Sequence, residues 1–243
     1  MDRRQLSTGN RRPMTDLEKN IAQVQERIAA ACLRARRRPE KVKLVAVSKT
    51  VPPDRIREAY NAGLRDFGEN RVQEAHSKHA ALSDLTVTWH LVGHLQTNKA
   101  KLARELFHCV HSLDSLRLAQ KLDQAAVCSG DRLPVLVEVN LGEEAAKSGV
   151  TEQEVLSLAE HVSRLPTLEL RGLMVLPPLF EDPERARPFF RRLRELAETI
   201  EAAKLPNVSA HELSMGMSHD LEVAIEEGAT MVRIGTAIFG RRT

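Results

Sequence analysis

The sequence has few aromatic residues and few cysteines, and it lacks long hydrophobic segments. Its 243 residues include one Trp, one Tyr and six Phe, so a stacking platform for single-stranded nucleic acid is not expected. The three cysteines show no Cys-x-x-Cys spacing, which argues against a disulfide framework and a structural zinc site. No apolar run approaches the roughly 18 residues of a membrane span, and the first 14 residues lack the apolar stretch of a signal peptide. We therefore expect a cytoplasmic protein that binds neither membranes nor nucleic acid.

The net charge of +3 is unevenly divided along the chain. Residues 1–41 contain 11 Lys and Arg and 5 Asp and Glu, a net of +6, so the other 202 residues carry 25 − 28 = −3. Residues 1–14 show no hydrophobic period, and we predict that they form a disordered basic extension. A second basic run closes a predicted helix, where cations suit the helix dipole: Arg34, Arg36, Arg37 and Arg38. We interpret this run as a solvated helix end rather than an RNA-binding patch.

From Thr15 onward, short β-rich segments alternate with amphipathic helices. Thr15 and Glu18 form a capping box, and the helix that follows ends before Pro39. Strands are predicted at 43–48, 65–67, 86–92, 107–111, 134–139, 168–174, 209–213 and 230–234, and further helices at about 53–62, 70–82, 97–106, 115–127, 151–164, 183–204 and 218–227. Eight such units without a flexible linker predict a single closed (β/α)8 barrel of the TIM type over residues 15–243. A doubly wound open sheet is the alternative.

The polar residues that follow the predicted strands are the candidates for function, because TIM barrels place their sites at the carboxyl ends of the strands. Lys49 follows the first strand. Partial desolvation there would lower the pKa of its amine and make it a nucleophile for carbonyl groups. An ordinary solvated lysine is the alternative interpretation.

Two turns of small residues follow the seventh and eighth strands, where barrels frequently bind phosphate. Gly216 and Gly235 would let the backbone approach an anion, and Ser214 and Thr236 would supply hydroxyl groups. Either turn alone also fits an ordinary loop and helix cap. The two together favour a phosphate site.

Arg233 lies on the alternating face of the eighth strand that is predicted to point into the barrel. A buried guanidinium stays charged and needs acceptors. These are either a carboxylate such as Glu69 or Glu138, or a ligand atom such as a pyridine nitrogen. An amine for a Schiff base, a phosphate cup and an arginine for a ring nitrogen are together the three contacts that pyridoxal 5′-phosphate (PLP) requires.

Several long motifs resemble those of the pyridoxal-phosphate homeostasis protein family, whose single domain is similar to the barrel domain of bacterial alanine racemase. The resemblance covers about residues 15–242. It is carried by Val-Ser-Lys49-Thr, Phe67-Gly-Glu-Asn-Arg-Val-Gln-Glu74, Trp89-His-Leu-Val-Gly-His-Leu-Gln96, His111-Ser-Leu-Asp114, Leu213-Ser-Met-Gly-Met-Ser218 and Val232-Arg-Ile-Gly-Thr-Ala-Ile-Phe-Gly240. His219 departs from the acidic residue expected in many relatives.

The resemblance implies a role for each candidate residue. Lys49 would form the Schiff base with PLP, and Arg233 would face the pyridine nitrogen. Asn70 and His90 would line the cofactor, although a helix cap and a satisfied interior histidine are the respective alternatives. The phosphate would be held by Ser214, Gly216, Gly235 and Thr236.

Two classes of function fit such a barrel, a PLP carrier and a PLP-dependent amino-acid racemase or decarboxylase. An arginine beside the ring nitrogen disfavours its protonation and weakens the ring as an electron sink. The racemases that the chain resembles also use a tyrosine from an additional β domain, whereas the only tyrosine here, Tyr60, falls on a predicted outer helix. We therefore predict a non-catalytic, monomeric protein that buffers PLP and passes it to apo-enzymes. A class I aldolase is a weaker alternative, because it leaves Arg233 unexplained.

Overall fold

Eight parallel strands close into a barrel in chain order, as the sequence predicts. The computed structural model describes residues 13–126, 132–142 and 148–240. The strands are β1 (Lys43–Val47), β2 (Asp66–Glu69), β3 (Thr88–Leu91), β4 (Cys109–Leu113), β5 (Leu133–Val139), β6 (Leu168–Val175), β7 (Val208–Ser214) and β8 (Met231–Ile234). Closure comes from the pairing of β1 with β8, in which Val45 lies beside Arg233. The fold is therefore the predicted (β/α)8 barrel, and the open-sheet alternative is wrong.

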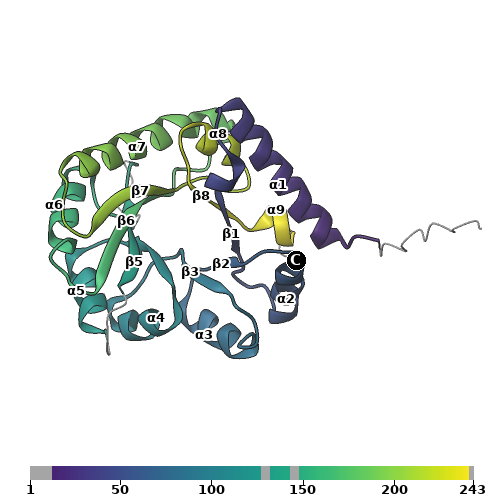
Figure 1. The fold of residues 1–243 in the computed structure, drawn as a ribbon, viewed down its shortest axis with the longest axis horizontal. Helices are drawn as coiled ribbons and strands as arrows, with labels where there is room; N and C mark the ends of the chain where they lie inside the picture. The colour runs from purple at the N-terminus through teal and green to yellow at the C-terminus, as the bar shows by residue number, and fades with distance from the viewer. Residues whose placement is uncertain (1–12, 127–131, 143–147, 241–243) are drawn as a thin grey trace, which may run out of the picture.

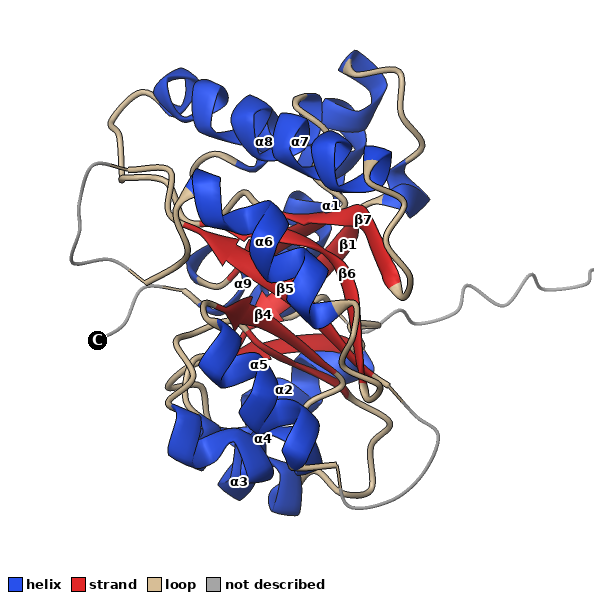
Figure 2. Ribbon diagram, turned by 90° about the vertical axis from the view of Figure 1, so that its left-hand side faces the viewer, coloured by secondary structure: helices blue, strands red, loops and turns tan. Residues whose placement is uncertain are grey.

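The helices form a ring around the strands (Figure 1), and the side view shows strands between helices above and below (Figure 2). They are α1 (Asp16–Arg34), α2 (Pro53–Asn61), α3 (Val72–Ala81), α4 (Ala100–Leu106), α5 (Leu116–Gln124), α6 (Glu152–Val162), α7 (Arg187–Ala202), α8 (Leu221–Glu226) and α9 (Thr236–Phe239), with 3-10 turns at Pro39–Lys41, Thr97–Lys99 and Pro183–Ala186. None of the helices in the described part of the chain has the length and apolar character needed to cross a bilayer.

The apolar core has two parts because each strand has two faces. Most buried aliphatic side chains pack between the strands and the surrounding helices. A small separate cluster contains Cys109, Leu136, Met174 and Met231. Side chains from β4, β5, β6 and β8 meet in the interior of a closed barrel, so this cluster marks the barrel axis. Side chains two residues further along each of these strands lie on the same face, so they also point into the barrel, closer to its mouth.

The structure changes two details of the predicted helices. Helix α8 begins at Leu221 instead of residue 218, because Asp220 Oδ1 accepts the backbone N–H of Met217 at 2.6 Å and holds residues 217–220 as a turn. The segment Thr236–Phe239 forms the short helix α9, which was predicted only as a turn. Four residues are too few to show a helical period in a sequence.

The predicted capping box is present at the start of α1. The Thr15 side chain accepts the backbone N–H of Glu18, and the Glu18 carboxylate accepts the backbone N–H of Thr15 at 2.7 Å. The predicted extension of residues 1–14 falls almost wholly outside the described residues, which begin at Pro13.

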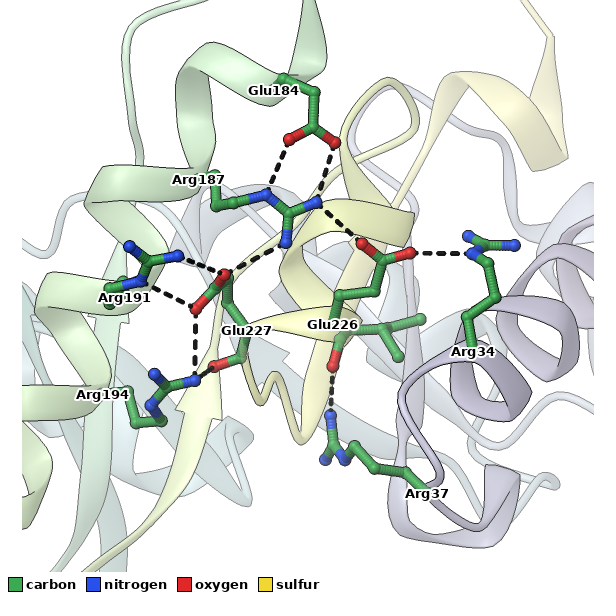
Figure 3. Close-up of polar contacts among 9 residues, drawn as sticks. Arg34, Arg37, Glu184, Arg187, Arg191, Arg194, Glu226 and Glu227 are labelled. Carbon is green, nitrogen blue, oxygen red and sulfur yellow. Dashed lines mark hydrogen bonds and ion pairs between the residues drawn. The ribbon is translucent and has the colours of Figure 1, made fainter.

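The basic run at the end of α1 contacts helix α8 (Figure 3). Arg34 pairs with Glu226 at 2.8 Å, and Arg37 donates to the carbonyl oxygen of Ile225 at 2.7 Å. These contacts belong to the packing of α1 on α8, so the run is not merely the solvated helix end that we expected. On the other side of α8, the buried carboxylate of Glu227 accepts from three arginines of α7: Arg187, Arg191 and Arg194. These hydrogen bonds and ion pairs together join the first, seventh and eighth helices.

Candidate functional site at the barrel mouth

A cavity of about 320 Å³ opens at the carboxyl end of the barrel. Its lining combines Lys49, Asn70, Arg233, Gly235 and Thr236, which are five of the residues singled out from the sequence. A second cavity of about 460 Å³ shares Lys49, Gly235 and Thr236 with the first and extends toward α2 and α9. The two cavities therefore meet at Lys49 and at the turn after β8.

The loop that carries Lys49 is held on both sides by polar contacts, which are buried on the Ser48 side and exposed on the Thr50 side. On one side, Lys78 Nζ donates to the carbonyl oxygen of Ser48 at 2.6 Å and to Glu69 Oε1 at 2.8 Å. On the other side, the backbone N–H of Thr50 donates to Glu74, which also accepts from Lys78 at 2.6 Å. Thr50 has a positive φ of 64°, a conformation that non-glycine residues seldom adopt. The surrounding contacts thus stabilise an unusual turn beside Lys49.

The sequence reasoning missed Lys78, although its spacing carried a signal. Lys78 is 5% exposed and lies on the buried face of α3 with Val72 and Ala75, at intervals of three residues. A lysine on the apolar face of a helix needs an acidic partner. Its partner, Glu69, is fully buried, and burial raises the pKa of that carboxyl even though Lys78 and Ser48 donate hydrogen bonds to it.

Arg233 is 4% exposed and is held by neutral oxygen acceptors rather than by a carboxylate. Its Nη1 donates to the carbonyl oxygen and the hydroxyl of Ser214, at 2.5 and 2.6 Å, and its Nη2 donates to the carbonyl oxygen of Val175 at 2.8 Å. Among the described residues, neither Glu69 nor Glu138 forms an ion pair with Arg233. Burial lowers the pKa of Arg233 to about 10, and the more distant charges of Glu138 and Asp220 oppose that shift. The guanidinium therefore remains charged at neutral pH.

The structure does not bring Ser214 and His90 to the cavity. The Ser214 hydroxyl is fully buried and contacts Arg233 and His111 Nδ1, the latter at 2.8 Å. His90 is 1% exposed, and its ring nitrogens contact His111 at 2.9 Å and Asp66 at 2.9 Å. The alternative of a satisfied interior histidine thus describes His90.

Gly216 also lies outside the cavity lining, and packing accounts for its small size. Its φ is +91°, and a Cβ atom there would lie 2.6 Å from the Cβ of Ala224 on α8. By contrast, Asn70 lines the cavity. The N-cap of α3 is Arg71, and no side chain in the described part of the chain caps this helix, so the helix-cap alternative for Asn70 is wrong.

The loop after β7 contributes residues that the sequence reasoning did not select. Met217, Ser218 and His219 line the cavity beside Gly235 and Thr236. Ser218 Oγ accepts the backbone N–H of Ala237 at 3.3 Å, which joins this loop to α9. The run of small and polar residues in this loop was the available signal, but only the structure shows that Ser218, and not Ser214, faces the mouth.

A further buried acid, Glu138, lies near the mouth at the end of β5. It is 5% exposed, and its Oε2 has no hydrogen-bond partner among the described residues. Burial, reinforced by the nearby charge of Asp114, raises the pKa of Glu138 to about 7. Asp114 itself pairs with His94 at 3.0 Å.

Comparisons with known proteins confirm the family resemblance. The family described as "Alanine racemase, N-terminal domain" matches residues 17–243. A pyridoxal phosphate homeostasis protein of Aquifex aeolicus is 49% identical over 222 residues, which cover 91% of this chain and 96% of that protein. The protein of the same name from Escherichia coli K12 is 44% identical over 232 residues, covering 94% of this chain and 98% of that one.

Solved structures agree with these sequence matches. The structure of PipY from Synechococcus elongatus PCC7942 with PLP bound has a TM-score of 0.78 and 42% identity, and it covers 90% of this chain and 100% of that chain. An alanine racemase of Clostridium difficile 630 has a TM-score of 0.70 but 15% identity, and this chain covers 57% of it. That second likeness supports the barrel fold alone.

Proposed function

This chain belongs to the family of pyridoxal phosphate homeostasis proteins, and from that membership and the geometry of the mouth we propose that it binds PLP and buffers its supply. The observation that carries the proposal is the shared lining of one cavity by Lys49, Arg233, Gly235 and Thr236. This set combines a primary amine, a charged donor and a turn of small residues within the size range of small-molecule sites.

The donor set fits the chemistry of the cofactor. PLP supplies an aldehyde that reacts with a primary amine, a pyridine nitrogen that accepts a hydrogen bond, and a phosphate that carries up to two negative charges near neutral pH. Lys49 offers the amine, and Arg233 offers the donor for the ring nitrogen. Gly235 and Thr236 in the turn after β8, together with Ser218 in the loop after β7, line the part of the cavity that suits the phosphate. Asn70 also lines the cavity and would contact the cofactor there.

Within this proposal, the surrounding residues position the amine and do not react. Lys78 and Glu74 hold the backbone on either side of Lys49, so the amine emerges from a fixed loop. Three residues predicted for the site do not line the cavity, because they contact other parts of the protein: His90, Ser214 and Gly216. Arg233 remains a donor, because its guanidinium has no lone pair to accept a proton.

We infer a carrier rather than an enzyme. A hydrogen bond from Arg233 leaves the ring nitrogen without a proton, which weakens carbanion stabilisation. The single tyrosine, Tyr60, lies on α2, where its ring contacts the guanidinium of Arg65 at 3.9 Å. It therefore does not serve as a second acid or base at the mouth. We also propose that the protein is a monomer and that it releases PLP to apo-enzymes.

The proposed place of action is the cytoplasm. Cys32 and Cys109 are buried thiols outside any disulfide, as is usual for proteins of a reducing compartment.

The proposal is tested by adding PLP to the purified protein, reducing it with borohydride and mapping the modified peptide by mass spectrometry. In the parent protein, we expect one phosphopyridoxyl group, on Lys49. In Lys49→Ala, we expect that the visible absorbance band of the bound cofactor, recorded before reduction, is lost. The exposed Lys41→Ala serves as the control and should behave like the parent. Labelling of other lysines with none on Lys49 would overturn the assignment.

Carrier and enzyme are separated by a second measurement. The PLP-loaded protein is incubated with L- and D-amino acids in deuterium oxide, and the α-proton is followed by NMR. A carrier exchanges this proton no faster than free PLP and reactivates an apo-PLP-enzyme that is added afterwards. Much faster exchange that is lost in Lys49→Ala would make the protein an enzyme.

A further inference from the structure

A chain of buried polar side chains runs through the barrel interior from the mouth to its opposite end. Arg233 Nη1 lies 2.6 Å from Ser214 Oγ, which lies 2.8 Å from His111 Nδ1. His111 Nε2 lies 2.9 Å from His90 Nδ1, and His90 Nε2 lies 2.9 Å from Asp66 Oδ1. Four consecutive short contacts therefore connect a guanidinium with a carboxylate.

The two ends of this chain lie in different surroundings. Arg233 lines the cavity at the mouth. Asp66 is the first residue of β2, at the amino end of the strands, and its Oδ1 is 3.6 Å from Lys43 Nζ. The side chain of Asp66 is 22% exposed, whereas His111 is fully buried. This chain of hydrogen-bonded side chains thus connects the mouth with the solvent-accessible rim at the amino ends of the strands.

The carboxylate of Asp66, together with a neutral His90, fixes the direction of every hydrogen bond in this series. A guanidinium only donates, and an ionised carboxylate only accepts. Asp66 therefore requires a proton on His90 Nε2, which leaves Nδ1 of a neutral ring as an acceptor. His111 then donates from Nε2 and accepts at Nδ1, and Ser214 gives its hydroxyl proton to His111 while accepting from Arg233. The Arg233 end alone does not fix the direction, because the Ser214 oxygen has two lone pairs and could accept from both Arg233 and His111.

The surrounding electrostatics support a neutral His111 between the charged ends. Burial lowers the pKa of His111 well below its usual value, and the charge of Arg233 acts in the same sense. Burial opposes ionisation of Asp66, but its hydrogen bond from His90 and the charge of Lys43 outweigh this effect, so the pKa of Asp66 is lowered.

The same region has ligand types for a metal ion, since atoms of His90, Cys109 and His111 lie within 4.8 Å of one another. The facing nitrogens of the two histidines are, however, already joined by a hydrogen bond. Burial also raises the pKa of the Cys109 thiol, which disfavours the thiolate that a metal needs. The hydrogen-bonded chain is the better account of these residues.

We propose that His111 is a positioning residue: it orients the Ser214 hydroxyl as an acceptor, which holds Arg233 with its remaining N–H groups directed at the ring nitrogen of PLP. The proposal rests on the proposed function for the identity of the ligand. The direction of the hydrogen bonds does not depend on the proposed function, because it is a property of the ligand-free protein.

The direction is tested without ligand by long-range nitrogen–proton NMR on the ¹⁵N-labelled protein, which shows which ring nitrogen carries a proton. The expected result is a proton on Nε2, and none on Nδ1, of both His90 and His111. In His111→Phe, the Nε–H resonance of Arg233 should shift or broaden, because the Ser214 hydroxyl, which accepts from Nη1 of the same guanidinium, has lost its orientation. A proton on Nδ1 of either histidine, or an unchanged Arg233 resonance, would overturn the proposal.

The consequence for the ligand is tested by PLP titration with His111→Phe and, because that variant loses two buried hydrogen bonds, also with Asp66→Asn at the accessible end. Both should weaken PLP binding, His111→Phe by about tenfold or more and Asp66→Asn by less. Both should also shift the visible band of the bound cofactor while borohydride still labels Lys49. The exposed His76→Gln is the control.

The outcomes separate the two proposals. If the parent protein does not bind PLP, the proposed function fails, and the NMR measurement still decides the direction of the chain. If the parent binds PLP but folded Asp66→Asn and His111→Phe match it in affinity and spectrum, the positioning role of His111 is overturned while the proposed function stands.

Discussion

The ammonium of Lys78 lies 2.6 Å from the carbonyl oxygen of Ser48, the residue that precedes Lys49. Helix α3 thus reaches under the loop after β1 and holds it with a buried charge. Because Lys78 is paired with both Glu69 and Glu74, the ion pairs and the position of Lys49 depend on each other.

Removal of this charge should destabilise the protein strongly. Lys78→Met keeps the length of the side chain but leaves Glu69 buried without its counter-ion, and we expect a loss of about 3–5 kcal/mol in the free energy of unfolding. Urea denaturation of the ligand-free protein measures it. Lys19→Met, which removes an exposed pair with Asp16, is the control and should cost at most about 1 kcal/mol.

The double variant Lys78→Met with Glu69→Gln should recover part of this loss, because it removes the uncompensated carboxylate. Equal stability of Lys78→Met and the parent would show that the ammonium contributes little. If Lys78→Met and the double variant lose the same free energy of unfolding, the unpaired charge of Glu69 is not the cause of the destabilisation.

A negative charge at the turn after β8 should abolish PLP binding. A Cβ atom on Gly235 would lie 3.2 Å from the carbonyl oxygen of Val47, so any side chain there is crowded. Gly235→Asn reports this crowding, and Gly235→Asp adds repulsion of the phosphate. We expect Gly235→Asp to bind PLP at least about tenfold more weakly than Gly235→Asn. Equal affinities of the two variants in a titration would place the phosphate elsewhere.

Glu138 should make the stability of the ligand-free protein depend on pH. Burial raises its pKa to about 7, whereas a glutamate in an unfolded chain titrates near about 4.3. Between these values the folded state holds a proton that the unfolded state has released, so the contribution of Glu138 favours folding more as the pH falls. Above pH 7 the folded protein instead contains a buried charge.

Glu138→Gln should therefore raise the free energy of unfolding by about 3 kcal/mol at pH 8 and by about 1 kcal/mol at pH 5. Urea denaturation across this pH range checks the prediction, with the exposed Glu105→Gln as the control. A gain for Glu138→Gln that does not change with pH would contradict the raised pKa.

A chain that begins at Met14 should keep its thermal midpoint and its PLP affinity. The capping box joins only Thr15 and Glu18, so the first helix contains its own start signal. In that shortened chain, Thr15→Ala should cost about 1 kcal/mol. A large fall in the midpoint on truncation alone would mean that residues 1–13 pack on the barrel.

The sequence by itself determined the barrel and placed Lys49 and Arg233 together at its mouth. Alternating segments predicted all eight strands, and the position of Lys49 and Arg233 at strand ends placed them at one rim. These inferences succeeded because hydrophobic period and strand polarity are local properties, and a parallel barrel brings all the carboxyl ends of its strands together.

Only the tertiary structure decided which of two serines in one short motif faces the cavity. Ser214 is the last residue of β7 and points to Arg233 and His111, while Ser218 in the following turn lines the mouth. The contact of Lys78 with the carbonyl oxygen of Ser48 and the contact between His90 and His111 were equally hidden. Such contacts join residues that are far apart in the sequence, and a side chain's direction at a strand end depends on the turn that closes against it. Local patterns contain neither kind of information, so they become visible only when the barrel is closed.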